Sequence, residues 1–140
     1  MIWCGLGLQE DRAAVAETTV SIIVPVRNGA EHLAACLERV GELDPAPLEC
    51  IVVDDGSEDA SAAAARRAGV RVISTGGQRG PAAARNLGAR AAQGEILWFL
   101  DADVVAGRDG VARVRSAFAS KAGLDAVIGS YDDAPGPPDF

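Results

Sequence analysis

The stretch Ile96-Leu97-Trp98-Phe99-Leu100-Asp101-Ala102-Asp103 joins five apolar residues directly to a pair of carboxylates. The apolar run predicts a buried β-strand, because it is short and rich in aromatic and branched residues. Asp101 and Asp103 must follow the end of that strand, since an unpaired carboxylate inside a core is expensive. At the mouth of a sheet, two carboxylates can hold a divalent cation, and such a cation can hold a diphosphate.

Strands and helices alternate along the rest of the chain. Besides residues 95–100, apolar and β-branched runs predict strands at 20–26, 48–53, 70–74 and 125–129. Helical spacing of apolar residues, bounded by Gly and Pro, predicts helices at about 30–41, 58–68, 81–92 and 109–120. This βαβαβαβαβ order predicts an α/β fold, an open and mostly parallel sheet with helices on both faces.

Three of the predicted strands end in polar clusters. These clusters are Pro25-Val26-Arg27-Asn28, Asp54-Asp55-Gly56-Ser57 and Asp101-Ala102-Asp103. Because ligands of open α/β sheets bind outside the carboxyl ends of the strands, we expect the clusters to meet at one edge. The helix that begins at Pro81 carries Arg85, and both its N-terminus and the guanidinium favour a nearby anion.

Each cluster taken alone also has an ordinary structural explanation. The acidic pair at 101–103 can be a solvated turn, residues 54–57 can be a turn with a helix cap, and Arg85 can be a surface residue of an amphipathic helix. In an extended backbone, however, Asp101 and Asp103 point to the same side and can share one Mg²⁺ or Mn²⁺. Such a cation would neutralise charge on a leaving diphosphate.

Length, charge and cysteine content exclude several classes of protein. The 140 residues suffice for one domain, and a hydrophobic content of 49% is typical of a globular chain. The net charge of −7 argues against nucleic-acid binding, and no apolar run is long enough for a transmembrane segment. Cys4, Cys36 and Cys50 lack zinc-ligand spacing, and their odd number fits a reducing compartment better than a disulfide framework. We therefore expect a cytoplasmic protein, in solution or at the inner face of the membrane.

Four motifs in register resemble the family 2 glycosyltransferases, which have the GT-A fold. The resemblance covers about residues 20–131 and rests on Ser21-Ile-Ile-Val-Pro-Val-Arg-Asn28, Ile51-Val-Val-Asp-Asp-Gly-Ser57, Ala84-Arg-Asn-Leu-Gly88 and Gly94-Glu-Ile-Leu-Trp-Phe-Leu-Asp-Ala-Asp103. It implies a nucleotide-sugar donor, a UDP- or GDP-sugar, bound with Mn²⁺ or Mg²⁺. It also implies inverting transfer of the sugar to an acceptor that the motifs do not identify.

By that resemblance, each cluster acquires a role. The ends of the first two strands would hold the nucleoside, with Asp55 the stronger candidate for the nucleobase contact. Arg85 would approach the phosphates or the sugar of the donor, and Asp103 would be the more direct metal ligand. The expected donor-binding residues are thus Pro25, Val26, Arg27, Asp54, Asp55, Arg85 and Asp101, and the expected metal ligands are Asp101 and Asp103.

The resemblance also sets the expected layout of the chain. We expect a poorly ordered leader at 1–18, a partial GT-A nucleotide-sugar-binding domain at 19–131, and a Pro-rich tail at 132–140 that leads to a missing C-terminal half. Family members carry the acceptor surface and the catalytic base in that half. No catalytic residue is therefore assigned, and the general base is expected beyond Phe140. Sheet surface that the missing half would cover predicts self-association.

Two other functions remain open from the sequence. The chain can be a truncated, catalytically inactive remnant that binds a nucleotide sugar, since the base and the acceptor region are missing. It can also be a nucleotidyltransferase, although Pro25-Val26-Arg27-Asn28 lacks the glycine-rich, basic character of a loop that grips a triphosphate. Neither GxGxxG after a strand nor GxxxxGK[ST] occurs, so NAD sites and P-loop NTPases fit poorly.

Overall fold

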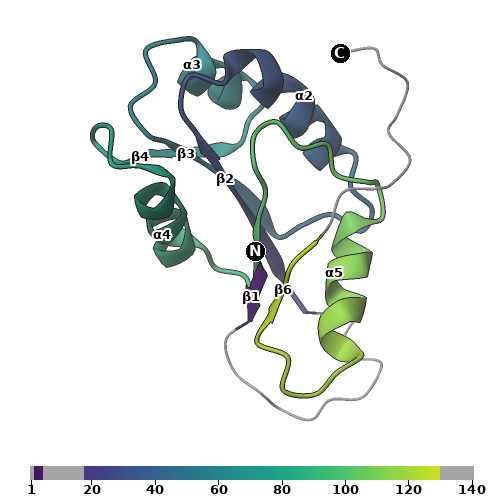
Figure 1. The fold of residues 1–140 in the computed structure, drawn as a ribbon. Coiled ribbons are helices and arrows are strands. Elements are labelled where there is room, and N and C mark those ends of the chain that lie inside the picture. Colours follow the sequence, from purple (N-terminus) through teal and green to yellow (C-terminus); the bar gives the residue numbers. More distant parts are fainter. Residues whose placement is uncertain (1, 5–17, 130–140) are drawn as a thin grey trace.

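The computed structural model describes residues 2–4 and 18–129. They form a six-stranded sheet in the order β4-β3-β2-β5-β1-β6, flanked by helices (Figure 1). The first four strands of that order are mutually parallel, so the predicted open, mostly parallel α/β sheet is confirmed. The strands are β1 (Ile2–Cys4), β2 (Val20–Val26), β3 (Glu49–Asp54), β4 (Arg71–Ser74), β5 (Ile96–Phe99) and β6 (Ala126–Val127). The helices are α2 (Ala30–Gly41), α3 (Ser61–Arg67), α4 (Pro81–Ala91) and α5 (Gly110–Ala119).

Helices cover both faces of the sheet, as the sequence predicts. One face packs against α2, α3 and α5 around a core that includes Ile22, Val52 and Leu33. The opposite face packs against α4 through Ile23, Val53 and their neighbours. The central strands are therefore buried on both sides, which explains why they read as nearly continuous apolar runs.

The order of the parallel strands reverses between β2 and β5. From β2 the chain moves outward through β3 to β4, and it then returns to place β5 on the other side of β2. Because parallel crossovers keep one handedness, this return places α4 on the face opposite α2 and α3. The carboxyl ends of β2 and β5 thus form the topological switch point at which ligands of such sheets bind.

A glycine seats α4 directly on the sheet. A Cβ at Gly88 would lie 2.4 Å from Cγ2 of Ile23, closer than real contacts allow, and 3.0 Å from Cγ2 of Val53, which is tight. The helix therefore packs backbone against side chain at this position. Arg85 lies one turn nearer the N-terminus of α4, so the packing at Gly88 sets how close Arg85 comes to the strand ends.

The structure differs from the expected layout at the N-terminus. Residues 1–18 are expected to be a leader outside the core, yet Ile2–Cys4 form β1, which pairs antiparallel with both β5 and β6. A segment of three residues is too short for a period-2 pattern to appear in the sequence, which is why this strand was missed. Residues 1 and 5–17 and the Pro-rich tail at 132–140 lie outside the described residues. None of the described helices is both long and apolar enough to cross a membrane.

Candidate functional site

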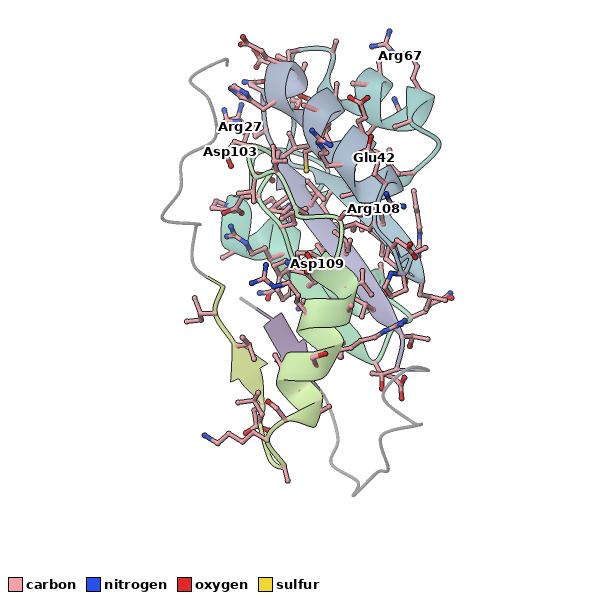
Figure 2. All side chains as sticks on the ribbon, turned by 90° about the vertical axis from the view of Figure 1, so that its right-hand side faces the viewer. Arg27, Glu42, Arg67, Asp103, Arg108 and Asp109 are labelled. Atoms are coloured by element: carbon pink, nitrogen blue, oxygen red, sulfur yellow. The ribbon has the colours of Figure 1, made fainter. Side chains whose placement is uncertain are left out.

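The structure brings the three polar clusters to one edge of the sheet. Val26 at the end of β2 is paired with Asp54 at the end of β3, and Ile23 is paired with Phe99 of β5. The clusters that follow these strands therefore flank the switch point between β2 and β5. In Figure 2, Arg27 and Asp103 lie together at this end of the molecule, away from Asp109 at the start of α5.

The loops after β2 and β3 clamp each other. The backbone amide of Asn28 donates to Oγ of Ser57 at 3.0 Å, and the side-chain oxygen of Asn28 accepts the amide of Glu58 at 2.8 Å. Asn28 reaches this geometry with a φ of 50°, a conformation that Asn tolerates better than most residues. Asp59 and Ser61 accept the amides of Ala30 and Gly29 at the start of α2. The backbone beside Arg27 is thereby held in one shape.

Asp55 organises the glycine-rich loop at 75–80. Its buried carboxylate accepts hydrogen bonds from the hydroxyl of Thr75 at 2.7 Å and from the amides of Arg79 and Gly80, both at 2.8 Å. The amide of Arg79, then the Thr75 hydroxyl, with smaller help from Gly80 and from the charge of Arg27, lower the pKa of Asp55 despite its burial. Asp55 is therefore a carboxylate with a fixed orientation.

Asp55 also lies at the N-terminus of α4, where the sequence predicts a nearby anion. That N-terminus is expected to favour a nearby anion, and the anion in the structure is Asp55, bonded to the amide of Gly80, the residue that precedes the helix. A carboxylate offers about four lone-pair positions, and Thr75, Arg79 and Gly80 take three of them. One position on Oδ2 is left for a further donor. The sequence predicted the carboxylate and the helix N-terminus as separate features, and the contact between Asp55 and Gly80 was not predicted.

Arg85 and Asp101 form an ion pair across the switch point. Nη2 of Arg85 lies 2.6 Å from Oδ1 of Asp101, with 36% of the arginine side chain and 52% of the aspartate side chain exposed. The pair joins α4 on one face of the sheet to the loop after β5. Sequence reasoning selected both residues, but it did not foresee their contact, because 16 residues separate them.

The backbone of the acidic pair is a turn, the ordinary alternative that the sequence left open, and not the extended chain on which a shared cation was predicted. The amide of Val104 donates to the carbonyl of Asp101 at 3.0 Å, which closes a turn over 101–104. The side-chain alternation of a strand therefore does not apply to Asp101 and Asp103, and a cation shared by them would rest on the geometry of the turn. A short solvent-facing loop beyond the sheet has no neighbouring strand to bond to. A local backbone hydrogen bond therefore takes the place of the interstrand hydrogen bonds.

The donor set at this turn fits a hard divalent cation that shares its shell with phosphate. Asp103 is exposed, and within residues 2–4 and 18–129 its carboxylate has no hydrogen-bond or ion-pair partner. No group of three or more His, Cys, Asp or Glu side chains in the described part of the chain could hold a metal. Mg²⁺ and Mn²⁺ are commonly held by one or two carboxylates plus substrate phosphates and water. The residues present thus suit a metal that arrives together with a diphosphate.

A cavity of about 530 Å³ opens beside Asp101, on the side of β5 away from β2. Apolar side chains of β5 and α5 line it together with Asp109 and Arg113. Its volume is in the range of small-molecule sites. Sequence reasoning assigned no role to Asp109 or Arg113, because neither belongs to a motif and helix α5 reads as an ordinary amphipathic helix.

The chain is similar to a known sequence family and to several named proteins. The sequence model described as glycosyl transferase family 2 matches residues 21–140. The chain is 31% identical over 117 residues to glycosyltransferase GlyG of Streptococcus pneumoniae and 34% identical over 120 residues to glycosyltransferase AglE of Haloferax volcanii. These matches cover 80% and 81% of this chain but 38% and 39% of the relatives. The chain thus spans about two-fifths of their length.

Solved structures share the fold of this chain over about two thirds of its length. Mannosyltransferase PcManGT from Pyrobaculum calidifontis, in complex with GDP-Man and Mn²⁺, is 33% identical with a TM-score of 0.63, over 69% of this chain and 31% of its own. Glucosyl-3-phosphoglycerate synthase from Mycobacterium tuberculosis, in complex with Mn²⁺, UDP and glucosyl-3-phosphoglycerate, is 27% identical with a TM-score of 0.55, over 64% of this chain and 35% of its own. TarS of S. aureus, 24% identical with a TM-score of 0.65 over 71% of this chain and 32% of its own, shows the fold alone.

Proposed function

This chain belongs to glycosyl transferase family 2 and has the GT-A fold, and on that premise we propose that it binds a nucleotide-sugar donor at the carboxyl edge of β2, β3 and β5. The observation that supports this most is the convergence of three polar strand ends and Arg85 at the switch point. Solved relatives that hold GDP-Man or UDP together with Mn²⁺ support the same class of ligand.

The nucleoside would lie over the ends of β2 and β3. There the backbone of Pro25 to Arg27 forms one wall, because the clamp between Asn28 and Ser57 holds it. Asp54 and Asp55 are both buried at the end of β3. The remaining acceptor position of Asp55 suits a nucleobase N–H, and its lowered pKa keeps it an acceptor at neutral pH. Arg27 would add positive charge at the rim.

The diphosphate would lie between Arg85 and the turn at 101–104. Arg85 supplies a guanidinium, which binds phosphate oxygens in a planar, two-pronged geometry. Asp101 and Asp103 would hold Mn²⁺ or Mg²⁺, with Asp103 the freer of the two carboxylates. When bound, the cation would supply Lewis-acid stabilisation of the departing diphosphate. The side chains of this chain would bind and orient the donor around it.

We further propose that the sugar is transferred with inversion to an acceptor, and that residues 19–131 form the donor-binding unit. No residue among 18–129 is assigned as the general base for the acceptor, which we place outside these residues. A donor-binding chain without turnover is the alternative. A transfer assay on this chain with UDP- and GDP-sugars separates the two, because sugar transfer by this chain alone excludes the inactive alternative.

Exposed apolar residues beside the 530 Å³ cavity support self-association. Val105, which lines the cavity, is 46% exposed, and Ile128, which lies between the lining residues Val127 and Gly129, is 80% exposed. Exposed apolar surface of this kind, gathered around a cavity, favours contacts between protein molecules. We propose that this chain associates with itself through the surface formed by Val105 and Ile128.

Isothermal titration calorimetry tests the donor proposal. UDP- and GDP-sugars are titrated into the protein with and without Mn²⁺, and the same titrations are repeated with Asp103→Asn. We expect binding of one nucleotide class that Mn²⁺ strengthens at least tenfold, and we expect Asp103→Asn to lose that strengthening. Asp125→Asn, the same change at an exposed residue just before β6 that lines neither the cavity nor the strand ends, is the matched control. Binding without a Mn²⁺ effect, or equal behaviour of both variants, contradicts the metal assignment.

A further inference from the structure

We propose that Arg85 is a positioning residue: it holds Asp101 before the donor arrives and then exchanges that carboxylate for the diphosphate. The exchange would make metal binding depend on nucleotide binding, so that the site takes up the two together. This inference rests on the proposed donor site and deepens it, because it assigns a regulatory role to an ion pair within that site.

The resting contact is a charged hydrogen bond. Nη2 of Arg85 donates to Oδ1 of Asp101 at 2.6 Å, and a guanidinium stays protonated at any physiological pH. An oxygen that accepts this bond offers less of its charge to a cation. A metal ion arriving alone therefore finds Asp103 free, whereas at Asp101 it meets the positive charge of Arg85, which already holds Oδ1.

The surroundings of Arg85 permit the exchange. Its side chain is 36% exposed, so the guanidinium can leave Asp101 without leaving a buried charge behind. The close contact of Gly88 with Ile23 fixes the backbone of α4, which restricts the movement to the side chain. A diphosphate carries more charge than one carboxylate and accepts the guanidinium at two oxygens, so it competes well for Arg85.

The exchange couples the two ligands. Once the diphosphate takes Arg85, Asp101 is released to the metal, and the metal in turn bridges to the same diphosphate. By thermodynamic linkage, each ligand then raises the affinity of the other by the same factor. Part of this coupling comes from the direct bond between metal and phosphate, and the part that depends on Arg85 can be removed by mutation.

Electron paramagnetic resonance of free Mn²⁺ tests the proposal on the whole chain. Mn²⁺ dissociation constants are measured without nucleotide and with UDP or GDP, after correction for Mn²⁺ bound to nucleotide in solution. The proteins are the wild type, Arg85→Gln and Arg90→Gln, which makes the same charge change on α4 outside the ion pair. Circular dichroism confirms that each variant is folded, and Arg85→Lys replaces Arg85→Gln if the latter is not.

Without nucleotide, we expect Arg85→Gln to bind Mn²⁺ about two- to fivefold more tightly than the wild type, the range for an exposed ion pair. Arg90→Gln should match the wild type. With nucleotide, the gain in Mn²⁺ affinity should be smaller in Arg85→Gln than in the wild type. Unchanged or weaker Mn²⁺ binding by Arg85→Gln, or an equal gain in all proteins, overturns the proposal. If no protein binds UDP or GDP, the donor proposal fails and the exchange with it, whereas the nucleotide-free comparison still decides whether Arg85 restrains Asp101.

Discussion

Replacing Gly88 with alanine should loosen the helix that carries Arg85. The new Cβ would lie 2.4 Å from Cγ2 of Ile23 and 3.0 Å from Cγ2 of Val53, so α4 or the sheet must move. Overpacking of this kind costs about 1–3 kcal/mol, whereas Ala gains about 1 kcal/mol over Gly in a helix. Because the 2.4 Å approach to Ile23 is severe, the cost falls in the upper part of that range. We therefore expect Gly88→Ala to lower the free energy of unfolding by about 1–2 kcal/mol, and to move Arg85 away from Asp101.

Urea unfolding followed by circular dichroism measures the change in stability. Gly41→Ala is the matched control, because position 41 ends α2 and a Cβ there meets nothing within 4 Å. Ile23→Leu removes the Cγ2 branch that the new Cβ would meet. The double variant should therefore recover part of the loss, and a double-mutant cycle should give a favourable coupling of about 1 kcal/mol.

Nucleotide titration measures the functional consequence. If α4 shifts outward, the affinity for UDP or GDP should fall in Gly88→Ala and recover in the double variant. A Gly88→Ala protein as stable as Gly41→Ala would refute the close packing of α4. A destabilised protein with unchanged nucleotide affinity would refute the link between Gly88 and the position of Arg85.

Three further predictions concern pH, thiol reactivity and assembly. Because the pKa of Asp55 is lowered, its stabilising bonds are present above its unfolded pKa of about 3.9 and are lost as pH falls through its lower folded pKa. Hydrogen exchange should show the amide of Gly80 still protected near pH 4, and loss of that protection between neutral pH and pH 4 would contradict this. Burial, with a smaller effect of neighbouring charge, raises the pKa of the Cys36 thiol to about 11 and that of Cys50 to about 12. Peptide mass spectrometry should therefore find both thiols unalkylated at pH 8 until the protein is unfolded, and rapid native labelling would refute this. Ile128→Asp should shift sedimentation toward the monomer, and an unchanged profile would exclude the proposed self-association surface.

The regular elements were predictable because their patterns are local. The central strands carry continuous apolar runs, which are typical of a sheet covered on both faces. The glycines and prolines between the strands mark the ends of the helices. Strand β1 escaped prediction because its partners, β5 and β6, lie more than ninety residues further along the chain. A strand of Ile2–Cys4 is recognisable only by what it pairs with.

The residue types of the candidate site were predictable, and their contacts were not. Carboxylates directly after buried strands indicate a ligand-binding edge, and this reasoning selected Asp55 and Asp101. It missed that Asp55 holds the loop before α4 and that Asp101 is already paired with Arg85. Both contacts join separate elements across a sheet edge, and no periodicity encodes them. The turn at 101–104 was predicted only as the alternative to an extended acidic pair, because the sequence pattern does not show where the strand backbone ends.

The location of the bound metal is the most direct test of the donor site. Mn²⁺ broadens nearby amide signals in nuclear magnetic resonance, so a ¹⁵N-labelled protein titrated with Mn²⁺ and UDP or GDP reports where the ion lies. We expect the amides of residues 101–104 to broaden first, followed by those of Arg27 and Asn28. The amides of Gln93 and Gly94, which lie at the opposite edge near Ser21 and Glu49, should stay sharp. Broadening centred on Gln93 and Gly94, or none at 101–104 in the presence of either nucleotide, would contradict a donor site at the ends of β2 and β5.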